Sequence, residues 1–419
     1  MAPPRKTRRR SPGEGGAFSY MTKLRKDPAD TGLRWFWKAP IRMPDGTTKI
    51  RTKSGFLTKE AALAAMQEAM VSGRKGTYVE PSKRTVGDWL DEWTGTLRHR
   101  PSTIASYRKN IRLHVKPYIG DLPLASLTST RLTRLYRELE ANGRRDGKGE
   151  PSGAGLSART VRYIHTIIGA ALAAAVEAEP PLLTRNPAAK AIPPSAQEAQ
   201  APEQHPWTAS QLRAYLNWAR GNSDLYPTWY VLAYTGIRRG ELLALRWRDV
   251  DLNAATMSIQ RTAGIVRNAG EGARIEEGPA KTKKSRRVID IDPATVAVLK
   301  SWKRERGELS LALARPDALV FSTLEGQHLH PERYWRSFKS AQARCRETLG
   351  DDAPPEISVH DLRHTHATLL LSAGEPVKTV SERLGHANVG ITLAVYAHVL
   401  PGDQKRAASR FAALVEEAI

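Results

Sequence analysis

The first regular pattern of apolar and polar positions predicts a small sheet packed on one helix. Large apolar side chains follow one another over residues 34–38, which is typical of a strand, and a turn signal at residues 44–46 leads to a second strand over residues 49–52. Thr58 then has the side chain of a helix cap and precedes an alanine-rich run. We therefore expect a small α+β domain over residues 17–80.

The next hundred residues carry apolar positions at helical spacing. Residues 81–185 are expected to be all-helical, because apolar side chains recur there at intervals of three and four residues. The stripes are Ile104, Tyr107 and Ile111; Leu132, Leu135, Tyr136 and Leu139; and Val161, Ile164, Ile168 and Leu172. The opposite face of the first helix is basic and holds Arg108, Lys109, Arg112 and Lys116. Such a face is either solvated or binds a polyanion.

A proline-rich segment divides the chain. Five prolines lie within residues 186–206, which favours a linker between domains. Thr208 and Gln211 have the spacing of a capping box, so a new helix and a new domain are expected to begin there.

The second half mixes strand and helix patterns. Residues 256–266 and 286–291 have the composition of strands, and Asp292 with the proline after it marks the start of a helix. An amphipathic helix over residues 403–418 has an apolar stripe formed by Ala407, Phe411, Leu414, Val415 and Ala418. We expect a mixed α/β, mainly helical domain over residues 207–419.

Charge narrows the range of functions. The 419 residues include 65 Lys and Arg against 43 Asp and Glu, a net charge of +22. This excess favours a polyanionic partner, with nucleic acid first and an anionic membrane second. Residues 1–16 are basic and rich in proline and glycine, and we expect them to be a disordered tail.

Composition also excludes several classes of protein. A single cysteine, Cys345, excludes a disulfide framework and a cysteine-rich zinc site. No apolar run follows the basic N terminus, and none approaches the length of a membrane span. We therefore expect a soluble cytoplasmic protein with no membrane partner.

Candidate chemistry begins at a turn between two helical segments. Arg238 lies in the sequence TGIRRGE over residues 235–241, where glycines bound the turn. Such a turn can hold an arginine rigidly, and a guanidinium binds two phosphate oxygens as a fork. The alternative is an ordinary helical corner with surface arginines.

A basic run lies before the strand expected at residues 286–291. Five of the seven residues 281–287 are basic, and they include Lys281, Lys283, Lys284 and Arg286. A flexible loop of this kind can bring a lysine to DNA, whereas a solvated basic hairpin is the common alternative.

Residues 360–366, HDLRHTH, are the densest polar cluster. In a helix, His360 and Arg363 share a face, which suits two groups that contact one phosphate. No cysteine or glutamate completes a familiar ligand set beside these histidines, so we expect no metal. A second pair with the same spacing, His330 and Arg333, shows that the spacing alone is not specific.

The order of the candidates is more specific than any one of them. The motifs TGIRRGE, AKTKKSRR, HDLRHTHAT, LGHANVGIT and AVYAHV follow one another in one domain, with Tyr396 ten residues after His386. In these motifs the chain resembles the tyrosine recombinase (phage integrase) family. The segment KPYIGDLPLASLT is similar to the core-binding domain of that family, over residues 84–185. Residues 17–75 resemble, more weakly, the arm-site-binding domain of larger integrases.

The resemblance implies a covalent mechanism. Tyr396 would attack a DNA phosphodiester and give a 3′-phosphotyrosyl link and a free 5′-hydroxyl, so that rejoining needs no cofactor. Arg238 and Arg363 would bracket the phosphate oxygens on which charge accumulates. Lys281 would protonate the leaving 5′-oxygen, although Lys283 or Lys284 is the acid if the hairpin register differs.

The resemblance also assigns supporting roles. His360 would assist proton transfer at the nucleophile, His386 would bond the scissile phosphate, and Glu241 would position the arginine turn. Residues 268–278 look like an insertion that lengthens the hairpin before Lys281. Expected DNA contacts elsewhere are Arg108, Lys109, Arg112, Lys116, Lys283, Lys284 and Arg286.

Together these implications describe the integrase of a phage or integrative element. The composition favours an element of actinobacterial type, and we expect the protein at the bacterial nucleoid. Its partners would be double-stranded DNA at core and arm sites and three further copies of the chain in a tetramer. A host DNA-bending protein and an excision factor complete the expected set. The alternatives are a conjugative-transposon integrase, a chromosome-resolving recombinase, or a catalytically silent DNA-binding regulator with the same fold.

Overall fold

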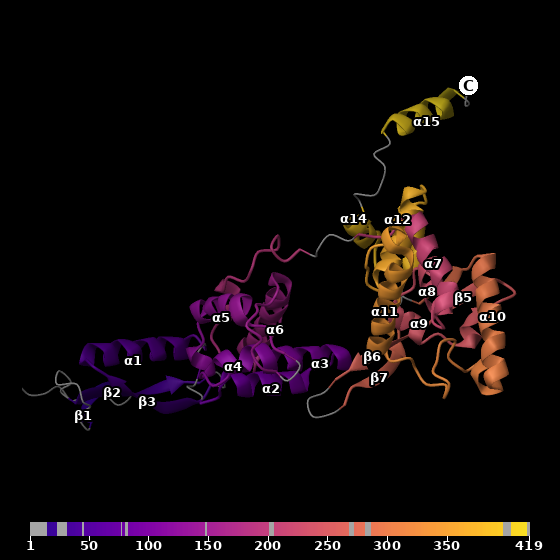
Figure 1. The fold of residues 1–419 in the computed structure, drawn as a ribbon. Helices are drawn as coiled ribbons and strands as arrows, with labels where there is room; N and C mark the ends of the chain where they lie inside the picture. Colours follow the sequence, from indigo (N-terminus) through magenta and orange to yellow (C-terminus); the bar gives the residue numbers. More distant parts are fainter. Residues whose placement is uncertain are drawn as a thin grey trace, which may run out of the picture. The chain divides into compact units, whose positions relative to one another are not determined.

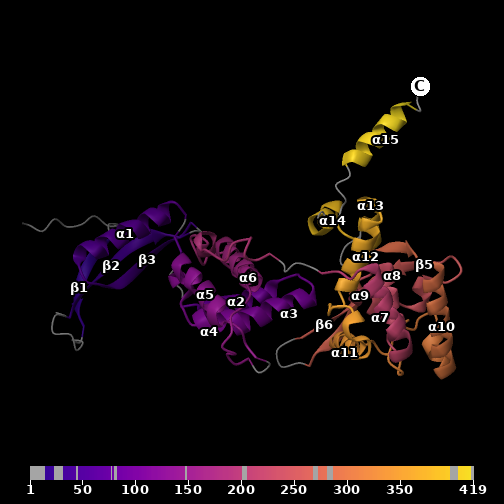
Figure 2. The same ribbon diagram turned by 45° about the horizontal axis from the view of Figure 1, so that its top comes forward.

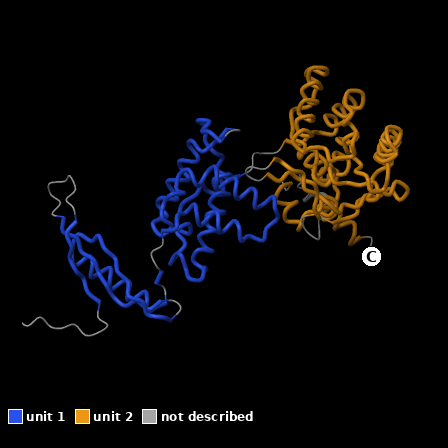
Figure 3. The backbone as a smooth tube through the Cα atoms, turned by 90° about the horizontal axis from the view of Figure 1, so that it is seen from below, with its two compact units in different colours: residues 1–201 blue, residues 202–419 orange. Residues whose placement is uncertain are grey.

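The protein is described here by a computed structural model. It describes residues 15–22, 32–43, 46–76, 78–79, 83–146, 149–200, 205–267, 272–280, 286–396 and 404–416. The chain divides into two compact units, residues 1–201 and 202–419, which Figure 3 colours separately. Separate hydrophobic cores lie within each unit. No helix in these ranges is long and apolar enough to cross a membrane.

A three-stranded antiparallel sheet opens the first unit. Its strands, in order across the sheet, are β1 (Gly16–Met21), β2 (Leu33–Arg42) and β3 (Thr48–Phe56). Figure 1 shows α1 (Lys59–Arg74) lying along one face of this sheet. Thr58 caps α1 as expected, since its hydroxyl accepts a hydrogen bond from the Ala61 amide. Trp37, Ile41 and Met66 are buried between the sheet and the helix.

The first strand, β1, is not predicted by the apolar pattern, which places Gly16 in a disordered tail. The strand has only six residues, some of them polar, so it has no clear apolar pattern of its own. It is ordered because it pairs along its whole length with β2. Residues 1–14 lie outside the described residues, as do Pro44 and Asp45 of the expected turn. Gly46 of that turn has φ +82°, which a tight connection between strands requires.

Helices form the rest of the first unit. They are α2 (Val86–Thr96), α3 (Pro101–Asn110), α4 (Lys116–Ile119), α5 (Ser129–Asn142) and α6 (Ala158–Glu177), with a π-helical turn (Ile111–Val115) between α3 and α4. The stripes predicted for α5 and α6 are buried in one shared core. The stripe on α3 lies at the edge of that core, where Ile111 is buried and Tyr107 only half-buried.

The expected linker over residues 186–206 begins too early. Residues Pro187–Lys190 form a 3₁₀ turn, and Ala188 and Ala191 are buried in the core of the helical bundle. The Asn186 side chain donates to the Gly169 carbonyl of α6 at 2.9 Å. Proline therefore closes a packed turn in this segment. The bundle extends through residue 194, because the Ile192 amide donates to Thr133 and the Pro194 carbonyl accepts from Arg162.

The second unit is mainly helical. Its helices are α7 (Ala209–Asn222), α8 (Tyr226–Thr235), α9 (Arg239–Leu243), α10 (Pro293–Leu309), α11 (Pro331–Leu349), α12 (Asp361–Ser372), α13 (Val377–Leu384), α14 (Val389–Tyr396) and α15 (Gln404–Glu416). The mostly buried α8 contacts α7, α10 and α12, an arrangement visible in Figure 2. Both predicted caps are confirmed, because Thr208 and Gln211 bond reciprocally and Asp292 accepts from the first amides of α10.

Residues 256–266 form two strands that belong to different sheets, where one strand was expected. β5 (Thr256–Ile259) lies between β4 (Val250–Asp251) and β8 (Arg287–Asp290). β6 (Arg261–Val266) pairs instead with β7 (Arg274–Pro279) as a separate hairpin. The expected insertion at residues 268–278 is therefore wrong for its second part, which is the returning strand. Residues 268–271 lie outside the described ranges.

Candidate active site

A tight turn after α8 places Arg238. Gly236 ends α8 with φ +64°, a left-handed conformation that favours glycine. A Cβ at this position would lie 2.6 Å from Cδ2 of His366, so the close approach also requires glycine. Arg238 then becomes the residue that precedes α9, with its side chain about one-third exposed.

Two arginines share one buried carboxylate beneath this turn. Glu241 accepts the Arg238 backbone amide at 3.0 Å and a guanidinium nitrogen of Arg238 at 2.9 Å. Arg287 donates at 3.1 Å to Oε2, the carboxylate oxygen that also accepts the Arg238 backbone amide. Burial would raise the pKa of the Glu241 carboxyl, but Arg287 and then Arg238 hold that pKa below its usual value. The ionised carboxylate therefore orients both guanidinium groups.

Arg238 also reaches the segment that contains His386. Its two terminal nitrogens lie 3.4 Å from the Leu384 carbonyl oxygen and 3.2 Å from the Gly385 carbonyl oxygen. The side chain of His386 is held in turn by Thr392 of α14, with 2.7 Å between Nδ1 and the hydroxyl oxygen. These contacts bring residues far apart in the sequence to one place.

Arg363 is the most buried cation of the group. Only 3% of the residue is exposed, and Nη1 donates to the Gly236 carbonyl at 2.7 Å. Its other terminal nitrogen, Nη2, is buried and has no hydrogen-bond partner among the described residues. Burial and then the charge of Arg238 lower the pKa of Arg363, which still remains a cation at neutral pH. An unpaired buried donor of this kind favours an anion as its missing partner.

Tyr396 lies at the end of α14 and is buried, with 3% exposed. Its hydroxyl oxygen lies 2.6 Å from Nδ1 of His364. Burial raises the pKa of Tyr396 to about 12, and Arg363 acts in the opposite direction. The sequence motif predicts His360, not His364, at this hydroxyl. His360 immediately precedes α12, and its ring packs edge-on against that of His364 with 4.9 Å between centroids.

The basic residues expected to contact DNA have different environments. Lys281, Lys283 and Lys284 lie outside the described residues, in the segment that joins β7 to β8. Exposed side chains are found at Arg108, Lys109, Arg112 and Arg286. Lys116 instead forms an ion pair with Asp91 of α2, so part of its charge is used within the bundle.

The second His-x-x-Arg pair has a structural role at its histidine. His330 caps α11, where its Nδ1 accepts from the Glu332 amide at 3.3 Å. Two other tyrosines of this unit, Tyr334 and Tyr234, have structural contacts. Tyr334 is buried and donates to Thr228, and the ring of Tyr234 stacks on Tyr230 with 4.1 Å between centroids.

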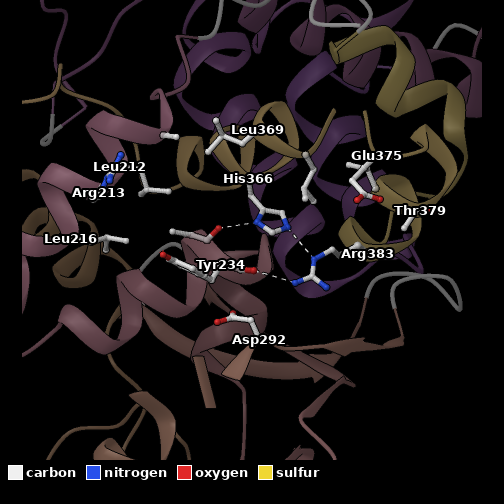
Figure 4. Close-up of a pocket in the computed structure, with 14 residues that line it drawn as sticks. Leu212, Arg213, Leu216, Tyr234, Asp292, His366, Leu369, Glu375, Thr379 and Arg383 are labelled. Carbon is white, nitrogen blue, oxygen red and sulfur yellow. Dashed lines mark hydrogen bonds between the residues drawn. The ribbon is translucent and has the colours of Figure 1, made fainter. Parts of the chain in front are cut away.

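Three residues in this region were not singled out by sequence motif: Arg287, His364 and Arg383. Figure 4 shows Arg383 beside His366 in a pocket of about 770 Å³. Arg383 donates to His366 at 3.0 Å and to the carbonyl oxygens of Asp290 and Tyr234. It thereby ties α13 to β8 and α8. Within the described ranges no three His, Cys, Asp or Glu residues are grouped as a metal would need.

Residues 210–402 match the family described as "Phage integrase family", and residues 85–139 match "Phage integrase, N-terminal SAM-like domain". The chain belongs to the phage integrase family. The family and the multidomain fold predicted from the sequence are thereby confirmed. The chain is a site-specific recombinase of the tyrosine type.

Relatives of this integrase include recombinases of bacteria and integrases of phages. It is 27% identical over 369 residues to a "Tyrosine recombinase XerC-like" protein of Caldanaerobacter subterraneus, with 84% of this chain and 88% of the relative covered. It is 26% identical over 334 residues to the integrase of Mycobacterium phage D29, with 79% of each chain covered.

Two solved structures share the fold. The integrase of the Tn1549 transposon, in complex with a circular intermediate DNA, has a TM-score of 0.62 at 21% identity and covers 78% of this chain and 99% of its own. A lambda integrase dimer bound to a core site has a TM-score of 0.52 at 15% identity and covers 93% of this chain and 96% of its own.

Proposed function

We propose that this integrase cuts and rejoins DNA through a 3′-phosphotyrosyl intermediate on Tyr396, to integrate and excise a phage or mobile element. The observation that carries the proposal is the buried Nη2 of Arg363, which has no partner among the described residues, in a site where Arg238 and Tyr396 also converge. A phosphodiester supplies the acceptor that this nitrogen lacks, and it places phosphorus within the reach of a tyrosine hydroxyl.

The two arginines suit the stabilisation of a pentacovalent phosphorane. Arg238 is held by Glu241 and by carbonyls of the LGH segment, and Arg363 is held by the Gly236 carbonyl. Both are therefore oriented before substrate binds, which is the condition under which such donors lower a barrier most. His386 would donate to a further phosphate oxygen, and Thr392 orients its ring.

The leaving 5′-oxygen needs a proton as it departs. Lys281 is our choice for this acid, with Lys283 and Lys284 as the alternatives in the same segment. The hairpin of β6 and β7 supports this placement, because the segment directly follows β7 and precedes Arg287, which itself bonds Glu241.

The small sheet of the first unit is proposed to bind arm-type DNA sites. Residues that alternate with buried Trp37 point away from α1, and the pairing of Phe18 with Phe36 puts both on that open face. The rings of Phe18 and Phe36 are 5.3 Å apart, and Lys38 and Arg42 lie along the same face of β2. Exposed aromatic and basic side chains together favour contact with a nucleic acid.

The helical bundle would bind the core site. Arg108, Lys109 and Arg112 are exposed on one side of α3 and the turn after it. A lambda integrase with this fold has been solved bound to a core site, and another as a tetramer on a Holliday junction. We extend both features to this chain, which would act as a homotetramer on paired core sites, assisted by a host bending protein and an excision factor.

The proposal is tested by Tyr396→Phe. We expect the variant to bind core-site DNA as the wild type does and to form no covalent adduct, because only the nucleophilic oxygen is removed. Denaturing gels of protein mixed with a nicked core site measure the adduct. Tyr334→Phe is the matched control, since it removes another buried hydroxyl and should leave the adduct intact.

A covalent adduct that still forms with Tyr396→Phe would contradict the assignment of Tyr396 as the nucleophile. Absence of any adduct in the wild type, with normal DNA binding, would favour the silent DNA-binding regulator instead.

A further inference from the structure

We infer that His364 is the base that takes the proton from the Tyr396 hydroxyl, in place of His360. The inference rests on the proposed role of Tyr396 as nucleophile. Its carrying observation is the direct contact of 2.6 Å between His364 Nδ1 and the Tyr396 hydroxyl oxygen. No hydrogen bond joins His360 to Tyr396 in the part of the chain that the structure describes.

The side chains of residues on both sides of His364 bond to α8 and its cap. The residue before it, Arg363, donates to the Gly236 carbonyl at 2.7 Å, and His366 lies 2.9 Å from the Ala233 carbonyl oxygen. Both acceptors belong to the last turn of α8 and its cap. His364 itself is 8% exposed, so its ring cannot swing out to solvent without disturbing this packing. The imidazole is therefore preorganised beside the nucleophile.

Protonation states agree with this geometry. Burial, followed by the neighbouring His360, lowers the pKa of His364 to about 4, so the ring is neutral at neutral pH. Tyr396 keeps its proton there, and the hydroxyl can donate to a lone pair on Nδ1. The titratable and charged groups that face His364 are His360, Asp361 and Arg363 from its own segment, and His386 and Tyr396 from α14 and the residues before it.

A bound scissile phosphate makes proton transfer from Tyr396 to His364 more favourable. A bound phosphodiester brings an anion beside His364, and an adjacent negative charge raises the pKa of an imidazole. Negative charge that develops during attack passes to the phosphoryl oxygens between Arg238 and Arg363, so no free phenolate has to form. An isolated imidazole has a pKa far below that of an isolated tyrosine hydroxyl, which disfavours proton transfer between them. Both effects make this transfer less unfavourable in the transition state.

The proposed step balances in both directions. In cleavage, the bond between Tyr396 oxygen and phosphorus forms while the bond from phosphorus to the 5′-oxygen breaks. The tyrosine proton moves to Nδ1 of His364, and the 5′-oxygen leaves with the bonding electron pair and takes a proton from the lysine of residues 281–284. In rejoining, a 5′-hydroxyl attacks the phosphotyrosine and gives its proton back to the neutral lysine, while the bond from phosphorus to the Tyr396 oxygen breaks. His364 returns its proton to the departing Tyr396 oxygen.

The place of His360 follows from the same geometry. Its ring packs edge-on against His364, with 4.9 Å between centroids. It is suited to hold the imidazole of His364 and to contact phosphate, because its own backbone immediately precedes the helix that carries Arg363. We assign it a positioning role behind His364 at the nucleophile.

The test compares His364→Asn with His364→Leu in the full-length protein. The amide oxygen of asparagine can stand where Nδ1 stands and accept the hydrogen bond, but it cannot take the proton, whereas leucine can do neither. The substrate is a core site with a bridging 5′-phosphorothiolate, whose sulfur leaves without a general acid, so the rate reports nucleophile activation. Covalent adduct is followed in single turnovers.

We expect both variants to form adduct at least about 100-fold more slowly than wild type, the low end for loss of a general base. The wild-type rate should fall as the pH is lowered through the pKa of His364 in the DNA complex, because only the neutral ring accepts a proton. The profile of His364→Asn should lack that fall, and the profile of His360→Asn should keep it. DNA affinity and melting temperature confirm that each variant is folded.

The outcomes are separable. Wild-type adduct rates in His364→Asn, with a slow His364→Leu, would mean that the hydrogen bond matters and proton transfer does not. Wild-type rates in both variants would overturn any role for His364. A loss of the pH-dependent fall in His360→Asn alone would return the base to His360. Adduct formed by Tyr396→Phe would refute the proposed function itself, which no result at His364 alone can do.

Discussion

At the scale of single residues, the site is a cluster of cations around one carboxylate. Arg238, Arg287 and Arg363 all act electrostatically on one another, and Glu241 is the acid they share. The cluster therefore carries excess positive charge in a buried setting, where charge is costly without a partner. Each guanidinium is fixed by a carboxylate or a backbone carbonyl, so the excess charge is presented at one fixed place. This arrangement suits recognition of a phosphate.

Replacement of Arg363 should separate catalysis from binding. We expect Arg363→Ala to slow single-turnover cleavage by roughly 10²–10³, or about 3–4 kcal/mol, because it removes one preorganised donor to the transition state. Affinity for core DNA should change much less, since we expect the exposed basic residues on other elements to make most phosphate contacts. Arg363→Lys serves as the control that keeps charge but loses the fork. Equal losses in cleavage and affinity would mark Arg363 as an ordinary phosphate anchor.

Replacement of Glu241 should reveal a pH-dependent part of the stability. The folded-state pKa of Glu241 lies below its unfolded value, so its stabilising contribution is present at pH 7 and is lost as pH falls through the folded pKa. Glu241→Gln should lower the free energy of unfolding by about 3 kcal/mol at pH 7, since it leaves the buried Arg287 and the partly exposed Arg238 without their counter-ion. The difference from wild type should shrink below about pH 4.5.

Urea unfolding of both proteins between pH 3 and pH 8 measures this difference. Glu308→Gln is the matched control, because Glu308 forms an exposed pair with Arg304 and its loss should change stability by less than about 0.5 kcal/mol. A gap between Glu241→Gln and wild type that stays constant down to pH 3 would contradict the assignment of an ionised, arginine-held carboxylate.

At the scale of helices and strands, local signals were sufficient where a short stretch of chain determines its own structure. The stripes on α5 and α6 and the caps at Thr208 and Asp292 follow from spacings of two to four residues, and the structure confirms them. The apolar pattern does not predict the return strand β7, because β7 is ordered by pairing with β6 and its own residues are charged and include glycine.

The polar contacts of the site were less accessible to such reasoning. Arg287 meets Glu241 across 46 residues of sequence, and His364 meets Tyr396 across 32. No periodicity within one element reports a contact over such a separation. Arg238, Arg363, His386 and Tyr396 could be identified from the sequence because their motifs follow the order found in a known family. His364 lies inside one of those motifs, and only three-dimensional geometry distinguishes it from His360.

The exposed face of α15 leads to a prediction about assembly. Phe411, Leu414 and Val415 are 71%, 60% and 47% exposed, on a helix too short to be stable alone in water. We expect Phe411→Ala with Leu414→Ala to weaken cooperative binding to paired core half-sites, while binding to a single half-site survives. Each buried side chain would contribute roughly 1.5–3 kcal/mol to docking on a neighbouring protomer.

Gel-shift titrations on one and two half-sites measure this cooperativity. Arg410→Ala is a control on the same helix, since it removes a charge and leaves the apolar side chains in place. If the double variant keeps full cooperativity, α15 docks on its own catalytic domain and the intermolecular mechanism is wrong.

At the scale of the whole molecule, the proposed chemistry and the proposed arm-site recognition reside in different units. All the described candidate catalytic groups lie between residues 238 and 396, within residues 202–419. Deletion of residues 1–80 should therefore leave core-site binding and cleavage intact and abolish binding to arm-type sites. Footprinting on a full attachment site measures both. A truncated protein that recombines such a site as well as wild type would show that the small sheet does not bind arm DNA.

The packing of Ala188 and Ala191 into the helical bundle has a consequence for how such proteins diversify and can be engineered. A gene fusion that joined two integrases at residue 186 would strip the bundle of two buried side chains and the Asn186 anchor. A junction after residue 194 keeps the bundle whole, because Ile192 and Pro194 still bond to Thr133 and Arg162, and it leaves the catalytic unit untouched. Exchange of targeting modules between related elements, by natural shuffling or in the laboratory, should therefore succeed at junctions in residues 195–206 and fail a few positions earlier.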